Sequence, residues 1–235
     1  MKALKELRLI LRDLAQEVEI LPAVGGAIQD LERPDVEERE DQAVNEDEKV
    51  FETIFERHPT GGRPPLYSPV PPVGRQEHHL FRFFIDGSFR SYFLGSMLEH
   101  ERETPVHFAQ LGACLLRRED DGTVRRETLE VQHLLLAGKK RISPDLWQRL
   151  EQMSGPAGLM LIDLNERDVL TKTVSDADLR DMAGGKVRFE MRRLESEIME
   201  LALGKLAPEN WLLMDGSLLF NPIAEILLRY SETIP

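Results

Sequence analysis

A stretch dense in proline and glycine limits what this chain can fold into more than any other feature. Residues 59–74 read PTGGRPPLYSPVPPVG, with six prolines and three glycines in 16 positions. Because proline lacks a backbone donor and both residues interrupt regular structure, helix and strand are excluded over most of this segment. We therefore predict an N-terminal segment over 1–58, a linker over 59–79 and one folded domain over 80–235.

The N-terminal segment has two parts of different character. Leucine and isoleucine recur between Leu4 and Leu14 at helical spacing, so the chain is expected to start with an amphipathic helix. Residues 30–48 then hold ten acidic side chains against two arginines, which is a charge of -8 out of the chain's net -12. Such runs are typical of solvated, flexible chain. We expect the helix to pack on the main domain or on a second subunit.

Composition excludes several classes of protein. With 30 basic against 42 acidic residues, the chain has the wrong net charge for a broad basic surface that binds nucleic acid. No stretch approaches the roughly 18 consecutive apolar residues of a membrane span. The single cysteine, Cys114, excludes an internal disulfide and a thiolate-rich zinc site. We expect a cytoplasmic protein without membrane contact.

Three strand candidates open the main domain. They cover residues 80–85, 104–116 and 127–136, which are rich in aromatic, β-branched and other apolar residues. Asp121 and Gly122 separate the second from the third and form a strong hairpin turn signal. These strands are therefore predicted to form an antiparallel meander.

A second set of elements follows the meander. Ser143 has the position of a helix N-cap, with Pro144 at the first helical position. Gly155 and Pro156 are expected to end this helix after about residue 153. The remaining elements are a strand over 158–164, a long helix over 186–206 and a strand over 211–219. This order predicts an α/β fold, with a mixed sheet flanked by helices and an N-terminal helical and acidic extension.

The pattern apolar, apolar, Asp, Gly, Ser, apolar occurs twice, at residues 84–89 and 213–218. Each copy continues a strand that we predict to be interior, where a carboxylate is costly unless a cation, a metal or several N–H groups meet it. The glycine allows another chain or a ligand to approach the backbone closely. A simple turn explains one copy, but two copies favour a site with Asp86 and Asp215 as its acids.

The long helix carries a third acidic candidate. At about 100° per residue, Glu195 and Glu197 flank the apolar face around Leu194, whereas Glu200 points to solvent and Glu190 stays open. An ordinary ion pair with a neighbouring arginine is the alternative for each glutamate. Carboxylates are hard ligands that suit Mg²⁺ or Mn²⁺, and a pair of such ions activates water and stabilises the leaving oxygen in phosphodiester cleavage. The pattern predicts a nuclease-type site.

These motifs resemble, in their order and separation, the NurA family of nucleases. They are IDGS at 85–88, a meander, RLE at 193–195 within a long helix, and LMDGSL at 213–218. The resemblance covers residues 80–220 and implies a ribonuclease-H-like core, a Mn²⁺ or Mg²⁺ cofactor and a homodimer. It also implies DNA as substrate and a HerA-like hexameric ATPase as partner, in DNA end processing or phage defence. By this resemblance Asp86 and Asp215 are metal ligands, with Glu195, or else Glu197, as the third catalytic acid.

The chain departs from the family pattern after the second motif, where NurA proteins normally continue with further strands, helices and active-site residues. Only residues 221–235 follow here. A shortened member, an interrupted product and one half of a split nuclease are the interpretations left open. The alternative function is a catalytically impaired subunit that docks on a motor ATPase or on a second nuclease chain. An ATP-binding relative, with Asp-Gly-Ser turns around phosphates, is a weaker alternative.

Overall fold

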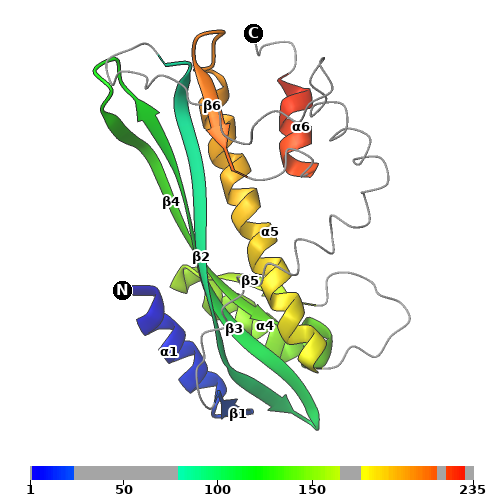
Figure 1. The fold of residues 1–235 in the computed structure, drawn as a ribbon. Helices are drawn as coiled ribbons and strands as arrows, with labels where there is room; N and C mark the ends of the chain where they lie inside the picture. The colour runs from blue at the N-terminus through cyan, green and yellow to red at the C-terminus, as the bar shows by residue number, and fades with distance from the viewer. Residues whose placement is uncertain (1, 24–78, 165–175, 216–220, 231–235) are drawn as a thin grey trace, which may run out of the picture. The chain divides into compact units, whose positions relative to one another are not determined.

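The computed structural model describes residues 2–23, 79–164, 176–215 and 221–230 (Figure 1). The described residues all belong to one compact unit. The predicted acidic segment and the predicted linker thus lie outside the described residues. Gly216 and Ser217 of the second Asp-Gly-Ser motif also lie outside them.

A six-stranded mixed sheet forms the centre of the described unit. Its strands are β1 (Glu19–Pro22), β2 (Phe81–Glu99), β3 (Arg102–Arg118), β4 (Val124–Ala137), β5 (Met160–Asp163) and β6 (Trp211–Met214). The order is β1-β2-β3-β4-β5, and β6 pairs with β2. β2, β3 and β4 are antiparallel, whereas β5 and β6 run parallel to β4 and β2. The predicted α/β class, mixed sheet and three-stranded meander are confirmed.

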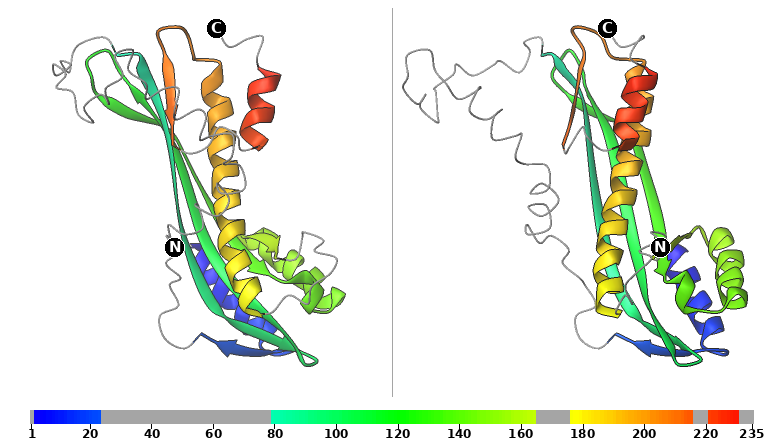
Figure 2. Two further views of the ribbon diagram at one scale, coloured as in Figure 1. Left: turned by 45° about the vertical axis from the view of Figure 1, so that its right-hand side comes forward. Right: turned by 90° about the vertical axis from the view of Figure 1, so that its right-hand side faces the viewer.

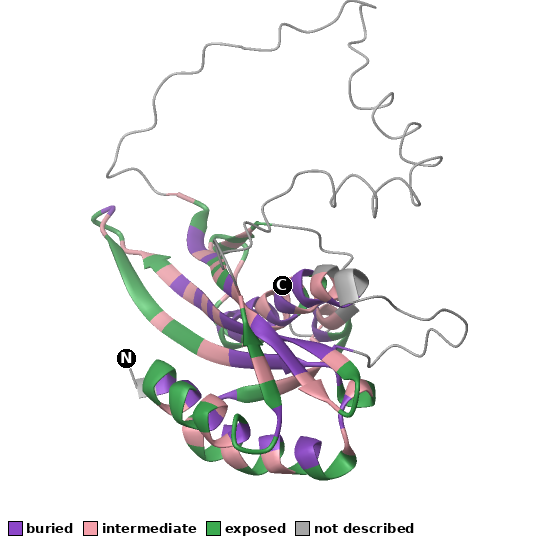
Figure 3. Cartoon of the chain, turned by 90° about the horizontal axis from the view of Figure 1, so that it is seen from below, coloured by how far each residue is buried: buried purple, intermediate pink, exposed green. Residues whose placement is uncertain are grey.

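Helices cover both faces of this sheet. They are α1 (Lys2–Leu14), α4 (Pro144–Ala157), α5 (Asp176–Leu203) and α6 (Asn221–Arg229), together with the short 3₁₀ helix η2 (Lys139–Arg141). Ala113 and Leu115 of β3 pack in one core with α5 and α6, whereas Phe108 packs in a second core with α1 and α4. Successive strand residues point to opposite faces, so the two cores lie on opposite sides of the sheet (Figures 2 and 3).

No helix in the described ranges is long and apolar enough to cross a membrane.

The N-terminal helix packs on the main domain, which is one of the two arrangements that we predicted. α1 shares its core with α4, and Asp13 accepts a 2.8 Å hydrogen bond from Arg149. The chain then continues into β1, which pairs antiparallel with the far half of β2. The N-terminal residues are therefore part of the same folded unit as the sheet.

The helix after the meander begins as predicted but ends later. The Ser143 hydroxyl accepts a hydrogen bond from the Leu146 backbone N–H, which confirms the N-cap. The helix continues through Pro156 to Ala157 and ends at Gly158, whose φ is +74°. The predicted stop at Gly155 is wrong because Gly158 takes the left-handed position, and its N–H bonds back to the Gly155 carbonyl.

β2 is much longer than predicted, and this changes the setting of the first Asp-Gly-Ser motif. The expected strand ended at residue 85, but pairing with β3 continues from Phe83 to Glu99. Gly95, at the one register shift of this pairing, has φ +147°, and a Cβ there would lie 2.2 Å from the Leu21 carbonyl oxygen. Asp86, Gly87 and Ser88 are therefore part of a continuous strand, and a chain turn at that motif is excluded.

Candidate functional site

The two motif aspartates come together where β2 and β6 run side by side. The two strands are parallel neighbours in the sheet (Figure 1). Ile85 of β2 is the register partner of Met214 of β6, and Asp86 and Asp215 directly follow these two residues. Both aspartates are exposed. The register thus places Asp86 and Asp215 at matching positions of neighbouring strands. The expectation of two buried carboxylates is wrong, because β6 is an edge strand among the described residues and Asp86 lies on the face of β2 opposite α5.

α5 supplies the third carboxylate. Glu195 is only 7% exposed and lies against Gly87, where a Cβ would come within 2.5 Å of its Oε1 atom. The Gly87 backbone N–H also donates a hydrogen bond to the Glu195 carboxylate. The predicted role of the glycine, to permit close approach to the strand, is thus fulfilled by a side chain of the same protein.

The environment of Glu195 favours its protonated form. Burial, together with the negative charges of Asp86 and Asp215, raises the pKa of this carboxyl to about 7, against the opposing effects of the Arg192 charge and the Gly87 N–H. All three carboxylates therefore lie within electrostatic range of one another. Acids with a pKa raised by burial and like charges are typical of catalytic and metal-binding sites.

The other glutamates of α5 are engaged elsewhere. The Arg193 guanidinium forms ion pairs with Glu190 at 2.8 Å and with Glu197 at 2.5 Å, and Glu197 is exposed. Glu200 accepts a 3.0 Å hydrogen bond from the hydroxyl of Tyr230, the residue after α6, so its predicted position in open solvent is wrong. Of the glutamates left open by the sequence, the structure brings only Glu195 to the two aspartates.

The donor set fits a hard divalent cation by its chemistry, since it consists of carboxylate oxygens alone. Within the described residues, however, no three acidic, histidine or cysteine side chains are already gathered closely enough to hold a metal ion. Gly87 faces α5 and Glu195, so strand alternation directs Asp86 to the opposite face. The described geometry thus leaves Asp86 and Glu195 on opposite faces of β2 and does not bring the three acids around one ion.

Replacing Gly87 by alanine should push Glu195 out of its buried position. The φ of Gly87 is not in the left-handed region, so the backbone accepts alanine, but the new methyl group would overlap the carboxylate. We expect the pKa of Glu195 to fall from about 7 toward its ordinary 4.5, because the displaced carboxyl regains water. Carboxyl-carbon NMR titration measures this shift.

Gly112→Ala is the matched control for this substitution. Gly112 lies opposite Ser88 on β3, and a Cβ there would meet only the Glu130 carbonyl oxygen at 3.8 Å. It should leave the Glu195 titration unchanged. A pKa that stays near 7 in the Gly87→Ala variant would show that Gly87 does not hold this carboxyl in place.

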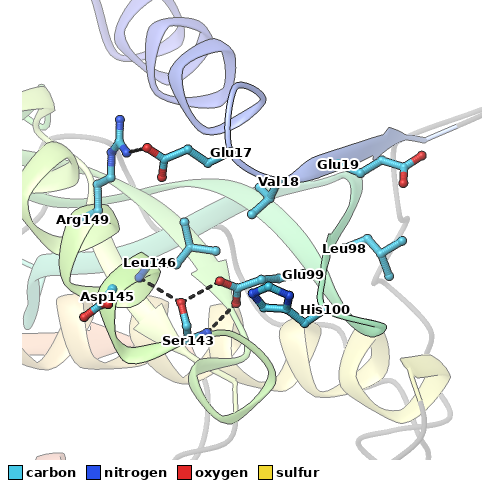
Figure 4. Close-up of a pocket in the computed structure, with 10 residues that line it drawn as sticks. All are labelled: Glu17, Val18, Glu19, Leu98, Glu99, His100, Ser143, Asp145, Leu146 and Arg149. Atoms are coloured by element: carbon cyan, nitrogen blue, oxygen red, sulfur yellow. Dashed lines mark hydrogen bonds and ion pairs between the residues drawn. The ribbon is translucent and has the colours of Figure 1, made fainter.

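A separate hollow of about 530 Å³ lies at the far end of β2, beside the turn to β3 (Figure 4). Its acids hold elements together: Glu99 accepts hydrogen bonds from the Ser143 backbone N–H at 2.5 Å and hydroxyl at 2.6 Å, and Glu17 pairs with Arg149. Twelve residues of β2 separate Asp86 from Leu98 in its wall, roughly 40 Å along the strand. This hollow is distinct from the carboxylate site.

Comparison with models of protein families, with curated proteins and with solved structures gave no match for this chain.

Proposed function

We propose that the chain is a metal-dependent deoxyribonuclease of the NurA type, which works with a HerA-like DNA translocase in DNA end processing or phage defence. The observation that carries the proposal is the register of Ile85 with Met214, because it puts Asp86 and Asp215 at matching positions of two neighbouring strands, within electrostatic range of Glu195. Two aspartates from parallel neighbouring strands and a glutamate from the covering helix also agree with the ribonuclease-H-like core that the motif order implies.

Each acid has a role that follows from its surroundings. In this proposal Asp86 and Asp215 are exposed ligands at the surface, open to a phosphate of the substrate. Glu195 is held by the Gly87 N–H and gives up its proton when a cation enters. Bound Mn²⁺ or Mg²⁺ supplies the positive charge that activates water and offsets the charge of the phosphodiester. The net charge of -12 then no longer opposes DNA binding at this point.

A nuclease assay with the full chain tests the proposal. Labelled single-stranded and duplex DNA should be cleaved in Mn²⁺, chelation by EDTA should stop cleavage, and addition of a HerA-like ATPase with ATP should extend it. Mn²⁺ should also raise the melting temperature, and more at pH 8 than at pH 6, because Glu195 must lose its proton to bind the cation. A chain that is folded, shows no Mn²⁺-dependent cleavage in either condition and gives no melting shift is not this nuclease.

The second candidate is a catalytically impaired subunit that docks on a motor ATPase or a second nuclease chain. The finding that favours it is that the described side chains do not form a ready-made metal-ligand group. Tight association with a hexameric ATPase, combined with no Mn²⁺ binding by calorimetry, would select this function. Mn²⁺ binding by the isolated chain would select the nuclease.

A further inference from the structure

Two exposed aromatic rings stand at the start of the strands that carry the aspartates. Phe81 opens β2 and Trp211 opens β6, and the two are register partners. Their ring centroids lie 5.9 Å apart with an interplanar angle of 87°. Phe81 is 44% exposed and Trp211 49% exposed, so large apolar ring surfaces of both face water.

Hydrogen bonds help to fix the Trp211 side of this pair. The Trp211 backbone N–H bonds to the Leu80 carbonyl at 2.7 Å, and its indole N–H bonds to the Pro208 carbonyl at 2.8 Å. The indole therefore has its polar group satisfied, while about half of the residue's surface faces water. The other tryptophan, Trp147, is only 6% exposed and packs in the core with α1 and α4. Trp211 is thus a preorganised contact surface, which loses little side-chain freedom when it binds a ligand.

The aromatic pair is aligned with the carboxylate site. On β6, Leu212 and Met214 pack on the core while Trp211 and Leu213 are exposed, so alternation places Asp215 on the same side as Trp211. Four residues separate Trp211 from Asp215, about 13 Å along a strand. Along both strands, the acids thus lie only a few residues from the aromatic pair.

An exposed arginine lies further along β2, beyond Asp86 as seen from the aromatic pair. Arg90 follows Asp86 by four residues of β2, with no register shift between them, so both side chains lie on one face. Aromatic rings, carboxylates and a guanidinium therefore follow each other along the same strand. Bases stack on aromatic side chains, and phosphates pair with arginine, in proteins that bind single-stranded nucleic acid.

We propose that Phe81 and Trp211 form a stacking platform for an unpaired base of the DNA strand whose phosphate reaches Asp86 and Asp215. This inference rests on the proposed nuclease function and specifies its substrate at this position as single-stranded. The bases of a duplex are stacked on each other and cannot lie on a side chain, so the platform discriminates in favour of an unpaired end or strand. Phe81 and Trp211 are positioning residues, because they hold the strand and do not touch the reacting phosphate.

Binding without cleavage tests the platform. All proteins carry Asp86→Asn, so that the DNA stays intact, and binding of fluorescein-labelled ten-nucleotide oligo(dT) is followed by anisotropy in the presence of Mn²⁺, which offsets the charge of the remaining acids. Trp211→Ala should weaken oligo(dT) binding about tenfold, whereas Trp211→Phe keeps a stacking ring and should stay within about threefold. Duplex binding should change less than twofold in either variant. Oligo(dT) should also quench Trp211 fluorescence while buried Trp147 remains as an internal reference.

Phe189→Ala is the control, because Phe189 is also exposed but lies on α5. It should bind oligo(dT) like the parent. Equal binding by the parent and Trp211→Ala, equal loss for duplex and single strand, or no oligo(dT) binding at all would overturn the platform. Light scattering tests one alternative role for these rings. If the parent is a dimer and Trp211→Ala is a monomer, the platform is overturned and the rings form a contact between two copies of the chain. Since no step requires cleavage, failure of the platform and failure of the nuclease proposal give separate results.

Discussion

Replacing Asp86 by asparagine should reduce Mn²⁺-dependent DNA cleavage by at least about 100-fold, since a carboxylate ligand to a catalytic cation contributes several kcal/mol to the transition state. Asp86 is exposed, and asparagine keeps its size, so the melting temperature should change by no more than about 2 °C. Single-turnover cleavage of a labelled oligonucleotide and a thermal melt of the same preparation measure the two effects.

Two further variants make this result specific. Asp215→Asn should lose cleavage to a similar degree, because Asp215 is the next residue after the register partner of Ile85. Glu197→Gln should keep it, because Glu197 pairs with Arg193 and not with the aspartates. If the Asp86→Asn protein retained more than about a tenth of the activity, or if Glu197→Gln lost as much as Asp86→Asn, this set of acids would be the wrong one.

The positions of the aspartates could be predicted because each motif sits in a strand with a strong local signal. Residues 80–85 and 211–214 are almost continuously apolar, which is typical of strands in a sheet covered by helices. Local sequence patterns do not predict which strands pair when the strands are more than 100 residues apart. The step from two strands to one site depended on the repetition of the motif; the structure shows the parallel pairing of β2 with β6, and the shared site stays a prediction.

The burial of the aspartates could not be predicted from the same signal. An apolar strand looks alike whether it is central or at an edge, and β6 is an edge strand in the described part of the sheet. Its exposed positions include Leu213, which the apolar pattern had indicated as interior. The exposed ring of Trp211 was missed for this reason, although a large aromatic residue at the first position of a short strand is a usable signal.

The choice between Glu195 and Glu197 also lay beyond helix periodicity. Both flank the apolar face at similar angles. They differ only in that Glu195 is on the side of α5 that contacts β2, whereas Glu197 is not. The same limit applies to Leu201, which follows Leu194 at helical spacing but is 59% exposed. β1 and α6 were not predicted because both are short, with four and nine residues. Ile223 and Ile226 of α6 are buried at helical spacing, a signal that was present but brief.

Replacing Glu195 by glutamine should stabilise the protein at alkaline pH even though it removes a residue of the proposed site. Since the folded-state pKa of Glu195 is raised from 4.5 to about 7, the folded chain binds a proton that the unfolded chain releases between these values. The free energy of unfolding therefore falls as pH rises from 4.5 to 7 and is lowest above pH 7. Glutamine keeps the shape and can still accept the Gly87 N–H, but it carries no charge to bury.

The gain should be about 2 kcal/mol at pH 8 after allowance for solvent screening, or about 4 to 8 °C in melting temperature, and close to zero at pH 4.5. Urea unfolding at both pH values, in EDTA so that no cation neutralises the site, measures it. Glu197→Gln is the matched control on the same helix: it loses an exposed ion pair with Arg193, so it should be neutral or slightly destabilising, with no such pH dependence. The contrary result is a Glu195→Gln protein whose free energy of unfolding changes equally at both pH values, or which is less stable than the parent at pH 8. It would mean that the cluster of Asp86, Asp215 and Glu195 carries no electrostatic strain. The reason to regard it as a site kept for function at a cost in stability would then be lost.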